Sequence, residues 1–116
     1  MVVQSQTVDN PVRLDKASCL LQWRHANPLD VYEFRIYLIG LDSNYNVVIP
    51  IARAGLGMGG AQDTAQVTLD SGSIGFGKGF LQMTAVDTAG NESNRSETIY
   101  YTRVIGAPFQ VRIIIE

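Results

Sequence analysis

The chain has 116 residues, of which 46% are hydrophobic, enough for one domain that buries roughly two thirds of the surface of its unfolded form. Its nine basic and eleven acidic residues leave a net charge of -2 with no basic block, which argues against nucleic acid and anionic membranes as partners. One cysteine, Cys19, excludes an internal disulfide, and no apolar run is long enough to cross a bilayer.

The first residues, MVVQSQTVDN, lack the basic start and the apolar centre of a signal peptide. We therefore expect either a protein that stays in the cytosol where it is made or a sequence that begins after a removed signal.

Alternation of apolar and polar residues predicts short strands along the chain and no helix of useful length. The first strand is broken by Asp9-Asn10-Pro11 and is expected at a sheet edge, because proline cannot donate to a ladder. Pro50 places the fourth strand at an edge for the same reason. Two glycine-rich loops, 54–63 and 72–79, flank the fifth strand. The predicted strands are 2–14, 17–24, 31–39, 47–53, 64–69, 80–86, 97–104 and 109–115.

Short strands with turns at this spacing indicate a single all-β domain over residues 1–116, an antiparallel two-sheet β-sandwich. The alternation also predicts which side chains share one face of each strand, and in the strand 17–24 this face points into the core. They are Cys19, Leu21 and Trp23; Tyr32, Phe34, Ile36 and Leu38; Ala65, Val67 and Leu69; and Leu81, Met83 and Ala85.

The run AVDTAGNES, residues 85–93, joins the end of a strand to a turn, since aspartate, glycine and asparagine accept turn conformations. With Trp23 and the strand 31–39, this run resembles the fibronectin type III-like domains, and an immunoglobulin-like topology is the related alternative. The resemblance covers residues 14–102 and implies that 109–115 is an added C-terminal strand. That family usually has a tyrosine near the start of the strand that here opens on Gly79, so the preceding corner must be held in another way.

One glycine motif matches a phosphate-binding pattern and one acidic motif matches a calcium-binding pattern, but both have simpler explanations. Gly55, Gly57 and Gly60 satisfy G-x-G-x-x-G, yet the phosphate-binding form needs a helix to follow and here a strand is predicted. Asp42 opens a D-x-N-x-N run typical of calcium loops, but Arg53 stands where the bidentate glutamate belongs. We therefore expect a loop and a turn.

Other polar residues offer little chemistry. Asp87, Asn91 and Glu92 could supply oxygens to a cation, although turn hydrogen bonds account for them equally well. His25, the only histidine, has no nucleophile beside it, because Cys19 is expected to point into the core. We predict no enzyme activity, no metal site and no cofactor.

Outward aromatic side chains suggest a second kind of site. Tyr37, Phe80, Tyr100 and Tyr101 could form a sugar-binding face, although some of them must belong to the core. Two N-x-S sequences in residues 91–96 matter only in a glycosylating secretory pathway.

The β-branched segment 109–115 is the main candidate for protein contact. Either it adds an edge strand to its own sheet, or it, or a strand at Val2 and Val3, pairs with a neighbouring subunit, because an exposed apolar edge is a template for β-augmentation. The two glycine-rich loops are the other expected contact surfaces. The predicted contact residues are Leu56, Met58, Phe76, Phe109, Val111, Ile113 and Ile115.

A signal-free chain with this fold resembles phage and virus particle components, such as capsid decoration or tail proteins. The resemblance implies a non-enzymatic structural module, a homo-oligomer or part of a larger assembly, located in the virion or in the cytoplasm before assembly. The alternative is a carbohydrate-binding or spacer module of a secreted bacterial glycoside hydrolase or adhesin.

Overall fold

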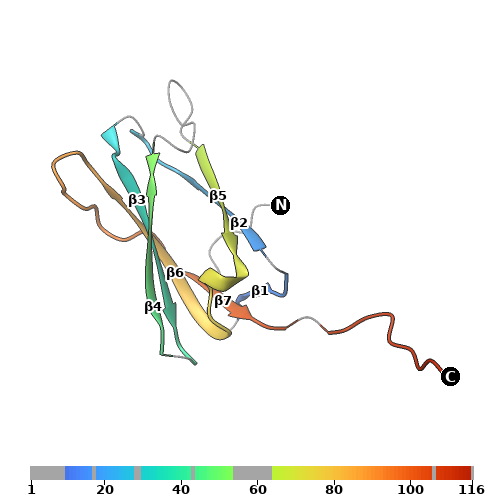
Figure 1. The fold of residues 1–116 in the computed structure, drawn as a ribbon. Helices are drawn as coiled ribbons and strands as arrows, with labels where there is room; N and C mark the ends of the chain where they lie inside the picture. The colour runs from blue at the N-terminus through green and yellow to red at the C-terminus, as the bar shows by residue number, and fades with distance from the viewer. Residues whose placement is uncertain are drawn as a thin grey trace.

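A computed structural model describes residues 10–16, 18–27, 30–42, 44–53, 64–105 and 107–115. Within these ranges the protein is all-β, with seven strands and a short 3-10 turn at Ser71–Ser73 between β5 and β6 (Figure 1). The strands are β1 (Val12–Leu14), β2 (Ser18–Arg24), β3 (Glu33–Gly40), β4 (Asn46–Ala52), β5 (Thr64–Asp70), β6 (Gly77–Val86) and β7 (Ile99–Arg103). No helix in the described ranges is long and apolar enough to cross a membrane.

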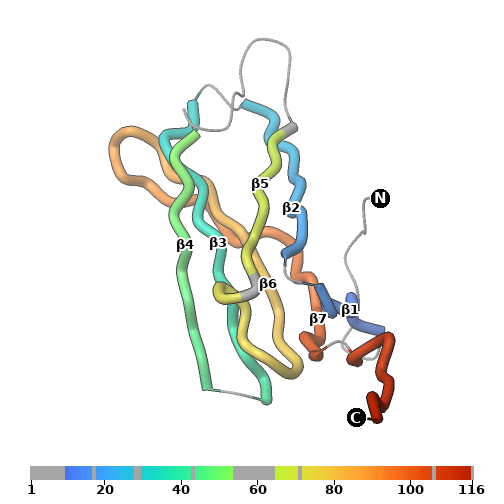
Figure 2. The backbone as a smooth tube through the Cα atoms, turned by 45° about the vertical axis from the view of Figure 1, so that its right-hand side comes forward, coloured from blue at the N-terminus to red at the C-terminus, as the bar shows by residue number. Residues whose placement is uncertain are grey.

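The strands form two sheets, which confirms the predicted all-β, two-sheet architecture. The larger sheet has the order β1-β7-β6-β3-β4, and the smaller sheet pairs β2 with β5. Figure 2 shows the smaller sheet lying over one face of the larger one. Both predicted edge strands are at edges, β1 at one end of the larger sheet and β4 at the other. The expectation of a purely antiparallel arrangement is wrong in one place: β1 runs parallel to β7, because the chain leaves β1 for the other sheet and does not turn back beside it.

The core lies between the sheets and follows the predicted alternation on β3. Phe34, Ile36 and Leu38 are buried, and the side chains between them point to the outer face. Tyr32 is a correction, since its side chain is 60% exposed and the neighbouring Val31 is buried. Tyr32 lies in a bend before β3 begins, so it does not share the alternation of the strand.

A pair of tyrosines, Tyr45 and Tyr101, holds the corner before β6. Tyr101 lies over Gly79, and a Cβ on that glycine would lie 2.7 Å from the Tyr101 hydroxyl. The buried Tyr101 hydroxyl is hydrogen-bonded to the Tyr45 hydroxyl, which also lies 3.4 Å from the Gly75 carbonyl oxygen. The Arg103 guanidinium donates to a carbonyl oxygen of the same corner. Side chains from β7 and from the approach to β4 therefore fasten the corner.

Two serines attach the segment after β6 to the edge of that strand. The Ser93 amide donates to the Ala85 oxygen at 2.8 Å, and the Ala85 amide donates to Ser93 Oγ at 2.9 Å. Ser96 repeats this exchange with Met83, at 2.7 and 2.8 Å. At each serine, the side-chain hydroxyl accepts the β6 amide hydrogen bond that a backbone carbonyl would accept in a regular ladder. Regular pairing therefore starts only at Ile99, two residues after the predicted start of the strand.

The predicted strand at 109–115 is not formed. Residues 107–115 have no strand hydrogen bonding, and in Figure 1 they lead away from the two sheets. β7 already pairs with β6 on one side and with β1 on the other. The C-terminal segment therefore cannot pair with β7, the strand that precedes it. Gln110 also has a positive φ of 55°, which interrupts an extended backbone.

Candidate functional site

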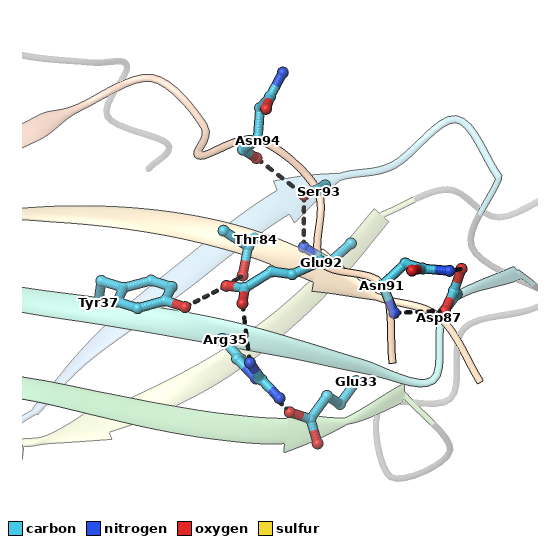
Figure 3. Close-up of polar contacts among 10 residues, drawn as sticks. Glu33, Arg35, Tyr37, Thr84, Asp87, Asn91, Glu92, Ser93 and Asn94 are labelled. Atoms are coloured by element: carbon cyan, nitrogen blue, oxygen red, sulfur yellow. Dashed lines mark hydrogen bonds and ion pairs between the residues drawn. The ribbon is translucent and has the colours of Figure 1, made fainter. Parts of the chain in front are cut away.

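A carboxylate network lies on the outer face of the larger sheet (Figure 3). Glu92, from the segment after β6, accepts a hydrogen bond from Arg35 Nη1 at 2.9 Å and another from Thr84 Oγ1 at 2.7 Å. The Tyr37 hydroxyl donates to the same carboxylate. Arg35 Nε in turn donates to Glu33 Oε2 at 2.7 Å. Three donors on two neighbouring strands therefore converge on one carboxylate.

These contacts set the charge state of the network. Hydrogen bonds from Tyr37 and Thr84, with the nearby Arg35 charge, hold the pKa of Glu92 below its usual range. The hydrogen bond to Glu33 raises the pKa of Arg35. A carboxylate that already accepts three protein hydrogen bonds is a poor base and a poor metal ligand. The role of these hydrogen bonds is to fasten the segment after β6 to the sheet.

Asp87 closes the turn before Glu92 and uses separate partners. Its Oδ1 accepts hydrogen bonds from the amides of Ala89 and Asn91, each at 2.9 Å, and Gly90 has a φ of 87°. The hydrogen bonds from Asn91 lower the pKa of the Asp87 carboxyl. The structure therefore does not bring the carboxylates of Asp87 and Glu92 onto one point, as the cation hypothesis requires.

His25 and Cys19 are also apart. His25 Nδ1 accepts the Asn27 amide hydrogen bond at 3.0 Å, and its ring lies edge-on to Phe34. Five residues of β2 lie between Cys19 and His25, and six steps of extended chain span about 20 Å. Burial raises the pKa of the half-buried Cys19 thiol, which disfavours the thiolate. The described residues contain no group of three or more side chains able to hold a metal ion.

Other sequence motifs have plain structural roles or cannot be placed. The Asp42 carboxylate accepts the Lys78 amide hydrogen bond at 3.0 Å and so joins the turn after β3 to the start of β6. The glycine motif at 55–60, with Leu56 and Met58, lies outside the described residues.

The proposed aromatic face is smaller than the sequence indicates. Tyr101 is buried in the core, and the Arg95 guanidinium lies 4.0 Å from the centre of the Tyr37 ring. Only Phe80 and Tyr100 remain together on the outer face, with ring centroids 6.0 Å apart.

The predicted contact residues fall into two places. Phe76 lies in the corner before β6, is 48% exposed and carries the Arg103 guanidinium 4.1 Å from its ring centre. The other described ones lie together on the C-terminal segment, residues 107–115. There Phe109, Val111, Ile113 and Ile115 are between 81% and 91% exposed.

An apolar groove between the sheets, which the sequence analysis missed, opens between β1 and β2. This inter-sheet groove has a volume of about 360 Å³, and among its wall residues are Leu14, Cys19 and Leu21, with Leu38 and Leu81 on its floor. A smaller hollow of about 190 Å³ continues it past Leu14 and Cys19. The predicted edge position of the first strand was the signal in the sequence that pointed to this side of the sandwich.

The groove opens where β2 has no described neighbour on its second side. β2 pairs with β5, and no described strand pairs with its other edge. Inward side chains of β1 and β2, such as Val12, Leu21 and Trp23, are therefore only half-buried, whereas Ala65 and Leu69 of β5 are buried. The Trp23 indole nitrogen is buried and has no hydrogen-bond partner among the described residues.

Comparisons of the chain with protein-family models, with curated proteins and with solved structures found no match.

Proposed function

We propose that this protein is a non-enzymatic structural module that joins a larger assembly through its C-terminal segment. The observation that carries the proposal is the exposure of Phe109, Val111, Ile113 and Ile115 outside the two sheets. Burying one such side chain stabilises a complex by about 1.5–3 kcal/mol before ordering costs. A β-branched apolar segment without a strand neighbour is also an aggregation hazard unless a partner covers it.

The kind of assembly is argued from the fold. The strand order supports a fibronectin type III-like or immunoglobulin-like assignment, with β1 as an added edge strand beside β7. A particle component of a phage or virus, such as a capsid decoration or tail protein, suits a sandwich whose polar groups are engaged in holding its own turns. In that setting the protein is cytoplasmic before assembly and part of the virion afterwards.

The test is the mass of the full chain in solution, measured by light scattering over a range of concentrations and repeated with residues 109–116 deleted. We expect a defined oligomer that becomes a monomer on deletion. Because the described part of this segment is exposed, the thermal midpoint of the monomer should match that of the dilute full chain. A full chain that stays monomeric at every concentration and has no protein partner would contradict the proposal.

One observation favours a second candidate, a carbohydrate-binding or spacer module of a secreted enzyme or adhesin. Phe80 and Tyr100 offer adjacent rings on the outer face, and sugars stack on such rings. If this is the function, Tyr100→Ala should abolish retention on the polysaccharide that binds the protein. Tyr32→Ala, which removes an exposed tyrosine elsewhere, should leave retention unchanged.

A further inference from the structure

We propose that the C-terminal segment of one copy of this chain occupies the inter-sheet groove of a second copy and lies there along the edge of β2 that no described strand pairs with. This inference rests on the proposed function, which names the segment as an assembly element. It adds the receptor for that segment and makes each contact a head-to-tail one.

The segment and the groove have the same length. β2 has seven residues, and Phe109–Ile115 is also seven residues, so each spans about 23 Å when extended. A donor strand of this length can lie along β2 on the side opposite β5, where no described strand pairs.

The side-chain pattern of the segment also fits the groove. In an extended strand Phe109, Val111, Ile113 and Ile115 lie on one face, and Gln110, Arg112 and Ile114 lie on the other. The first face is wholly apolar, as are the groove residues Leu21, Leu38 and Leu81. The second face carries the polar side chains and would point to solvent beside Leu20, which is itself 58% exposed on β2.

The connection to β7 favours a second copy over the same chain. The Val104 amide donates to the Leu14 oxygen at 3.0 Å, so the chain stays beside β1 just past the end of β7. β2 starts only four residues after Leu14, at the same end of the sandwich, and runs away from it. A segment folding back into its own groove must reverse at once and run parallel to β2, whereas the segment of another copy enters without that restriction.

Cys19 provides a native reporter, because its thiol lines the groove and is half-buried. The experiment measures the mass and the rate of Cys19 alkylation for three full chains: the natural one, Ile113→Asp and Ile114→Asp. The two substitutions are matched, since they add the same charge to adjacent residues on opposite faces of the segment. We expect the natural chain and Ile114→Asp to form oligomers with protected thiols. Ile113→Asp should be monomeric, and its Cys19 should react at least tenfold faster.

A peptide of residues 107–115 then tests the groove directly. Added to the Ile113→Asp chain, it should restore protection of Cys19, and the same peptide carrying the Ile113→Asp change should not. The natural chain should lose mass as the peptide competes.

The other outcomes separate this inference from the proposed function. If Ile113→Asp dissolves the oligomer but leaves Cys19 alkylation unchanged, the segment docks elsewhere, so the groove assignment is overturned and the proposed function stands. If the natural chain is monomeric and its Cys19 is protected, but Ile113→Asp makes Cys19 reactive, the segment fills the groove of its own chain. That result overturns the inference. Protection that is lost only on deleting residues 1–9 assigns the groove to the N-terminal residues and also overturns it. A monomer unaffected by either substitution contradicts both proposals.

Discussion

Replacing Gly79 by alanine tests how tightly Tyr101 and Tyr45 pack at the corner before β6. The new Cβ would lie 2.8 Å from the Ile39 carbonyl oxygen and 2.7 Å from the Tyr101 hydroxyl, whereas ordinary van der Waals contact begins at 3.4 Å. Both neighbours must therefore move by about half an ångström, and neither does so easily. Ile39 is paired in the β3–β6 ladder, and the Tyr101 hydroxyl is held by Tyr45.

The cost of such crowding is about 1–3 kcal/mol. Against it stands a gain of about 0.5–1 kcal/mol, because alanine has less freedom than glycine in the unfolded chain. We therefore expect a net loss of up to about 2.5 kcal/mol in the free energy of unfolding, measured by urea denaturation. The thermal midpoint should fall by roughly 4 °C per kcal/mol in a domain of this size.

The matched control is Gly72→Ala, because a Cβ at Gly72 meets nothing within 4 Å. Its urea midpoint should stay within experimental error of the parent or rise slightly. Adding Tyr101→Phe to Gly79→Ala removes the hydroxyl but leaves the ring carbon at 2.8 Å, so the double variant should remain destabilised. A Gly79→Ala chain as stable as Gly72→Ala would refute the reasoning.

Three further predictions probe the remaining contacts, each by urea unfolding, and two of them include a matched control substitution. Leu38→Ala empties a fully buried position and should cost about 2–5 kcal/mol, while Leu41→Ala, at a half-exposed position, should cost far less. Ser96→Ala leaves a partly buried β6 amide without its acceptor and should cost about 1–3 kcal/mol, whereas Ser93→Ala frees a more exposed amide and should cost less. The pKa of Glu92 is lowered in the folded state, so its stabilising contribution is present above the ordinary glutamate value of 4.5 and is lost as the pH falls below it. Glu92→Gln should therefore lose less stability than the parent between pH 6 and about pH 3, and equal acid slopes would contradict this assignment.

Local patterning predicted the sheets well because period-2 alternation reports burial directly. Phe34, Ile36 and Leu38 follow it, and so do the buried residues of β5. Tyr32 was misplaced because alternation does not mark the residue at which a strand begins. Pro50 was placed correctly on an edge strand, since the missing amide is a property of the residue itself.

The features that the sequence did not reveal depend on contacts between distant residues. Glu92 meets partners on β3 that lie 55 and 57 residues away, and nothing in the turn sequence names them. The C-terminal strand was predicted from β-branched residues, but pairing also needs a free edge, and β1 occupies the edge of β7. The groove arises from the unequal division of strands between the sheets, which no local pattern records.

That unequal division links assembly to stability. Five strands in one sheet face only two in the other, so the apolar inner face beside β1 is incompletely covered by the described part of the chain. A donor strand beside β2 would enlarge the smaller sheet to three strands and cover the half-buried side chains of Leu14, Cys19 and Leu21. The same contact would then hold copies together and complete the core of each. Under the head-to-tail inference, the thermal midpoint of the full chain must therefore rise with protein concentration, and that of a chain lacking residues 109–116 must not.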